Sequence, residues 1–108
     1  MSVLMEMCRK EVAEKVARAL KYLSGANMVM MKVDDRKVVA MAFWRGPLEP
    51  TAALGLLEDF KEALGALAYE MGLLEPGEVL KEVSVEMECN ESEGCRGFIV
   101  KQVLTPFP

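Results

Sequence analysis

The chain has 108 residues, 52% of them hydrophobic and 28% charged, and its formal net charge is −4. This length predicts one domain with one hydrophobic core. The apolar runs are much shorter than the roughly 20 residues that span a bilayer, and the first residues lack a secretory-signal pattern, so we expect a cytoplasmic protein without a membrane segment. Few amide side chains beside many Glu and Lys residues are typical of proteins from thermophiles.

Residues 3–23 carry an apolar side chain at every third or fourth position, which predicts an amphipathic helix. The polar face of this helix is basic and includes Arg9, Lys10, Lys15 and Arg18. Such a face predicts either a solvated surface or a docking surface for an acidic partner. The first 46 residues are net positive and the remainder net negative, an asymmetry that would also suit a self-complementary dimer.

Two apolar runs, at residues 28–33 and 38–44, flank a short charged turn, which predicts a β-hairpin. Neither run alternates between apolar and polar residues. A strand with one wet face alternates, whereas a strand that is covered on both faces reads as a continuous apolar run. We therefore expect both runs at the centre of a sheet with an element packed on each side.

Residues 51–72 form a second predicted helix, and its apolar arc is wider than one sheet face needs. So small a chain has little else with which to cover this arc, so we expect a homodimer rather than a helix buried inside a monomer. The interface expected from this arc and the end of the preceding strand comprises Leu56, Ala63, Ala66 and Trp44.

Residues 79–89 alternate strictly between apolar and mostly acidic side chains, which predicts a half-exposed edge strand. A short loop leads to a return strand at residues 95–104, and residues 105–108 read as a tail. The predicted architecture is a single α+β domain over residues 1–108. Its elements follow the order αββαββ, and helices pack on a mainly antiparallel sheet.

Cys89 and Cys95 flank the loop of this second hairpin. If they face each other across the ladder, their Cα atoms lie about 4.5–5.5 Å apart, which is within the range of a disulfide. Two buried thiols would fit the same positions. Zinc is the third alternative, although a structural zinc site needs four ligands and the chain has one further Cys.

The residue types that most catalysis uses are missing. The chain has no His, no Gly-rich phosphate loop and no nucleophilic Ser beside a suitable base. We therefore expect no catalytic residue, no cofactor and no metal. A protein–protein interaction or regulatory module is the predicted class.

Two other functions remain open from the sequence. A nucleic-acid binder would use Arg9, Lys10, Arg18, Arg45 and Trp44, although a sequence pI near 4.9 argues against it. A small-ligand binder would enclose its ligand in a pocket lined by some of the nine Met residues.

The order of these segments resembles the roadblock (roadblock/longin-type) family of small dimeric domains over about residues 12–88. A helix ends at Leu23-Ser24-Gly25-Ala26, an apolar strand with an Asp turn follows, and Met71-Gly72-Leu73 precedes a later strand. The chain departs from the family at Asp35-Arg36, where the family usually has Gly after the Asp. It is also too short for the family's further strand and C-terminal helix. The resemblance implies a homodimeric platform for a small GTPase or a larger complex, with a helix on each face of an antiparallel sheet.

Overall fold

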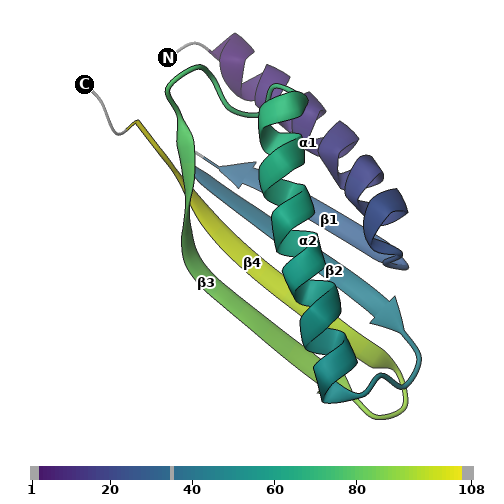
Figure 1. Cartoon of the computed structure of the whole chain (residues 1–108). Helices are drawn as coiled ribbons and strands as arrows, with labels where there is room; N and C mark the ends of the chain where they lie inside the picture. Colours follow the sequence, from purple (N-terminus) through teal and green to yellow (C-terminus); the bar gives the residue numbers. More distant parts are fainter. Residues whose placement is uncertain (1–2, 35, 106–108) are drawn as a thin grey trace.

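The computed structural model describes the backbone of residues 3–34 and 36–105, and the side chains of residues 9–34 and 36–105. Asp35 of the first turn and residues 106–108 of the expected tail lie outside the described residues. The described elements follow the predicted order αββαββ (Figure 1). They are α1 (Val3–Ser24), β1 (Met28–Asp34), β2 (Lys37–Arg45), α2 (Pro50–Glu70), β3 (Val79–Asn90) and β4 (Gly94–Leu104).

The four described strands form one antiparallel sheet in the order β1-β2-β4-β3. The sequence correctly predicted residues 38–44, in β2, as a central strand. The same prediction for residues 28–33 was wrong, because β1 forms an edge and, among the described strands, pairs only with β2. The alternating charges of β3 predicted an edge strand, and β3 does form the other edge.

Both helices lie on the same face of the sheet (Figure 1). The expectation of an element on each side of the hairpin is therefore wrong within residues 3–34 and 36–105. The exposure of β1 shows this directly, because its side chains alternate between exposed and half-buried along the whole strand. Neither of the described helices is long and apolar enough to cross a membrane.

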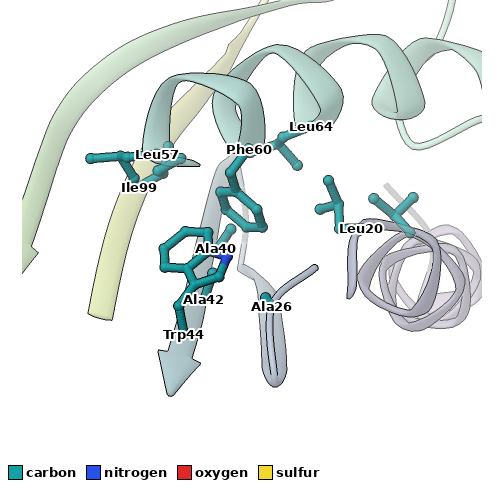
Figure 2. Close-up of a cluster of buried hydrophobic side chains, with 10 residues drawn as sticks. Leu20, Ala26, Ala40, Ala42, Trp44, Leu57, Phe60, Leu64 and Ile99 are labelled. Atoms are coloured by element: carbon teal, nitrogen blue, oxygen red, sulfur yellow. The ribbon is translucent and has the colours of Figure 1, made fainter. Parts of the chain in front are cut away.

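The core lies between the helices and the covered face of the sheet (Figure 2). Trp44 of β2 is 4% exposed and meets Phe60 of α2 edge-on, with ring centroids 6.0 Å apart. Its indole Nε1 donates a hydrogen bond to the carbonyl oxygen of Ser24, at 3.3 Å. Ala40 and Ala42 leave room on β2 for these rings because their side chains are small. Burial of these two aromatic rings removes a large apolar area from water and anchors α2 to the sheet.

Candidate functional site

The face of the sheet that points away from both helices is the candidate functional site, and we call it the open face. The strand register assigns its residues, because directly paired residues point to the same side of a sheet. Four rows of residues cross β1, β2, β4 and β3 in that order. The rows are Met28-Phe43-Arg96-Glu88, Met30-Met41-Phe98-Glu86, Lys32-Val39-Val100-Ser84 and Asp34-Lys37-Gln102-Lys81.

Apolar side chains occupy the middle of the open face. Met41 and Phe98 are direct partners on the two central strands, and both are half-buried although no described helix covers them. At the β1 edge, Met28 is 41% exposed and Met30 is 57% exposed. The open face thus presents an apolar centre to solvent.

Charged residues border this apolar centre. Lys32 lies on β1, and Glu86 and Glu88 lie on β3 at the opposite edge; all three are exposed. Arg96 stands over the ring of Phe43, with its Cζ atom 5.7 Å from the ring centroid, so its cation is held beside the apolar centre. An apolar centre with a charged border is the usual anatomy of a protein–protein interface.

A disulfide joins Cys89 and Cys95 at one end of the sheet. The register places the two residues directly opposite each other across the β3–β4 ladder, with Cα atoms 4.1 Å apart. Cys95 is buried at 1% exposure, whereas Cys89 is exposed. Of the three states that the sequence left open for this pair, the structure shows the disulfide, which closes the β3–β4 hairpin.

The residues expected to form a helix-mediated dimer interface do not share one exposed surface. Trp44 lies in the core beneath α2, and Leu56 and Ala63 are half-buried against the same core. Ala66 is exposed on α2. The apolar arc of α2 is thus largely covered within one chain, by the sheet and by α1.

The expected basic docking face is only partly free. Lys10, Lys15 and Arg18 are exposed on α1, but Arg9 is bound to Glu78, with Nη2 2.8 Å from Oε1. The aromatic residue expected to stack on a nucleic acid, Trp44, is buried. The structure therefore does not bring the proposed nucleic-acid contacts together on one surface.

The Met-lined pocket takes the form of an open groove between α1 and β1. One hollow of about 430 Å³ is lined by Met30 and Met31 together with Arg18 and Lys21. It is a groove rather than the enclosed apolar cavity that a small-ligand site needs. Among the described residues, no group of three or more His, Cys, Asp or Glu side chains is placed to hold a metal ion.

No family model, curated protein or solved structure matches this chain. The roadblock resemblance stays an expectation for function, and the arrangement that it implies, with a helix on each face of the sheet, differs from the one seen. Both described helices pack on one face.

Sequence reasoning missed the open face as a site, although the signal was present. The continuous apolar runs of the first hairpin indicated that both faces of those strands were suited to burial. The structure covers one of them. The alternate residues, including Met30, Met41 and Phe43, point to the other face.

Proposed function

We propose that this chain is a non-enzymatic protein–protein interaction module and that the open face is its binding surface. The observation that carries the proposal is the exposure of Met30, at 57%, beside the half-buried Met41 and Phe98 on one continuous face. Contiguous apolar patches larger than a few hundred Å² are rare on proteins without a partner. Binding would remove this surface from water.

The side chains of the open face suit a surface that accepts a partner. Met is unbranched and polarisable, so it adapts to the shape of an apposed surface. The backbone beneath is ordered by pairing on both sides of β2 and β4, so these two strands need no rearrangement on binding. A small GTPase or a subunit of a larger complex, as the roadblock resemblance implies, would be a partner of this kind.

The proposal is tested by placing a charge on the open face without disturbing the core. Met30→Glu does this, because Met30 is already mostly exposed at the sheet edge. Tyr22→Glu is the matched control, since Tyr22 is an apolar residue on α1 that is 89% exposed and lies away from the open face.

Wild type and both variants are used as bait in extracts of the source cells, and bound proteins are quantified by mass spectrometry. We expect at least one protein, or the chain's own untagged copy, to be retained by wild type and by Tyr22→Glu and lost with Met30→Glu. An identical set of bound proteins for all three baits would contradict the proposal. So would a bound metabolite with no protein partner.

A further inference from the structure

We infer that a second copy of this chain occupies the open face, with the two sheets packed face to face about a two-fold axis parallel to the strands. The inference rests on the proposed function, because it names the partner of the same surface. Its support is the self-complementary pattern of the residues that the register places on the open face.

A two-fold axis parallel to the strands exchanges the two edges of the sheet. β1 of one subunit then lies over β3 of its partner, and β2 lies over β4 of its partner. Each row of the open face meets the same row in reverse order. An isologous interface of this kind requires that each row fits the same row read in the opposite direction.

The two central strands, β2 and β4, meet this requirement with two apolar contacts and one cation–aromatic contact. In the second row, Met41 lies over Phe98 of the partner subunit. In the third row, Val39 lies over Val100 of the partner subunit. In the first row, Phe43 lies over Arg96 of the partner subunit, which repeats between subunits the cation–aromatic contact present within one chain.

At the borders, Met28 and Met30 lie over Glu88 and Glu86 of the partner subunit, and opposite charges meet elsewhere. Asp34 lies over Lys81 of the partner subunit in the fourth row. Lys32 lies one row from Glu86 of the partner subunit, and packed sheets stand about 10 Å apart, a gap that these two long side chains can bridge. No residue of the open face meets a residue of like charge in its own row.

The same charges disfavour the other two-fold axis that would stack these faces, which runs across the strands. That axis places β1 over β1 and β3 over β3 of the partner subunit. Lys32 would then lie near Lys32 of the partner subunit, and Glu86 near Glu86 of the partner subunit. Like charges juxtaposed at an interface are strongly unfavourable. That axis also places Glu88 over Lys81 of the partner subunit, so it is the charges of the two middle rows, Lys32 and Glu86, that favour the axis parallel to the strands.

The size of the open face fits a small dimer interface. Its four rows over four strands measure roughly 20 Å by 20 Å, from the usual strand spacing and rise per residue. This projection of roughly 400 Å² is about half of the roughly 800 Å² that each partner buries in a standard interface. Burial would cover Met28 and Met30 on β1, which are both exposed in the single chain.

The test is sedimentation velocity of the purified full chain over a range of concentrations, on wild type and charge-reversed variants. Lys32→Glu and Glu86→Lys each place like charges across the interface twice, because of the two-fold symmetry. We expect each to weaken dimerisation by about tenfold or more. The variant that carries both changes restores opposite charges and should return to within a few-fold of wild type. The control is Glu62→Lys, at an exposed position of α2, and it should dimerise as tightly as wild type.

Lys32, Glu62 and Glu86 are all exposed, and circular dichroism verifies that each variant folds. A wild-type monomer at all concentrations would overturn the inference. A dimer that neither single charge reversal weakens would also overturn it. That result would indicate the axis across the strands, where each reversal only replaces one pair of like charges by another. If the wild-type chain is a monomer but binds a different protein, and Met30→Glu abolishes that binding, the inference fails while the proposed function stands.

Discussion

Arg9 and Glu78 lie 69 positions apart in the sequence and form an ion pair, with Arg9 Nη2 2.8 Å from Oε1 and 3.0 Å from Oε2 of Glu78. The pair joins the first half of α1 to the segment between α2 and β3. The backbone N–H of Glu75 donates a third hydrogen bond to Glu78, at 2.7 Å. A residue that the sequence offered for docking is thus part of the fold's internal structure.

The first prediction concerns the pH dependence of stability. Burial raises the pKa of Glu78, but the Glu75 N–H and the Arg9 guanidinium outweigh it and hold the pKa below its ordinary value of 4.5. A carboxyl with a lowered folded-state pKa stabilises the fold above its unfolded pKa, and this contribution is lost as pH falls through the folded pKa. We expect Glu78→Gln to lower the free energy of unfolding at pH 7 by roughly 2 kcal/mol. The gap from wild type should close below pH 4.5.

Urea denaturation of both proteins at several pH values measures this gap. Glu75→Gln is the control, since the Glu75 side chain is exposed and Glu75 contributes its backbone N–H to the pair. If the difference in the free energy of unfolding between wild type and Glu78→Gln stays constant from pH 7 to pH 3, the charge of Glu78 does not contribute to stability.

The second prediction concerns the disulfide. Cys89 and Cys95 are separated by six positions, and closing a loop of this length stabilises a fold by about 2 kcal/mol through the entropy of the unfolded chain. Reduction should therefore lower the free energy of unfolding of wild type by that amount. A double variant, Cys89→Ser with Cys95→Ala, should unfold identically with and without reductant. If reductant lowers the free energy of unfolding equally in wild type and in the double variant, the Cys89–Cys95 disulfide does not cause the loss.

The third prediction compares two glycines. Gly94 opens β4 with φ of +132°, and a Cβ atom there would collide with the carbonyl oxygen of Trp44. Gly94→Ala should destabilise the fold by about 3 kcal/mol, because it adds both backbone strain and this collision. Gly55 lies within α2, and a Cβ atom added there would meet nothing within 4 Å beyond the backbone of its own helix, so Gly55→Ala should stabilise the fold by about 1 kcal/mol. Thermal unfolding with equal shifts for the two variants would refute this difference.

The order of helices and strands followed from local patterns, whereas the order of strands in the sheet did not. The strict alternation of β3 was enough to predict an edge. The apolar run of β1 predicted burial on both faces, but Met28 and Met30 are exposed on the open face. A periodic pattern reports how much apolar surface a strand carries and not which element covers it. The position of a strand in the sheet depends on long-range pairing. Here β2 pairs with β4, and β4 follows α2 and β3 in the sequence.

The roles of individual residues showed the same division. Trp44 lies at the end of the apolar run at residues 38–44, and from the sequence we expected it at an interface. Its edge-on contact with Phe60 of α2 places it in the core instead. The loop length between Cys89 and Cys95 allowed a disulfide and left two alternatives open. Local spacing was informative there because the two residues are close along the chain.

The most direct test of the account is hydroxyl-radical footprinting of the purified chain at high and low concentration, with oxidation measured at single residues. Met30 and Tyr22 are both exposed in one chain, at 57% and 89%, but only Met30 belongs to the open face. If a second copy covers that face, Met30 is protected at high concentration and oxidised faster on dilution, while Tyr22 reacts at the same rate throughout. Oxidation of Met30 at one rate over the whole concentration range would contradict the account.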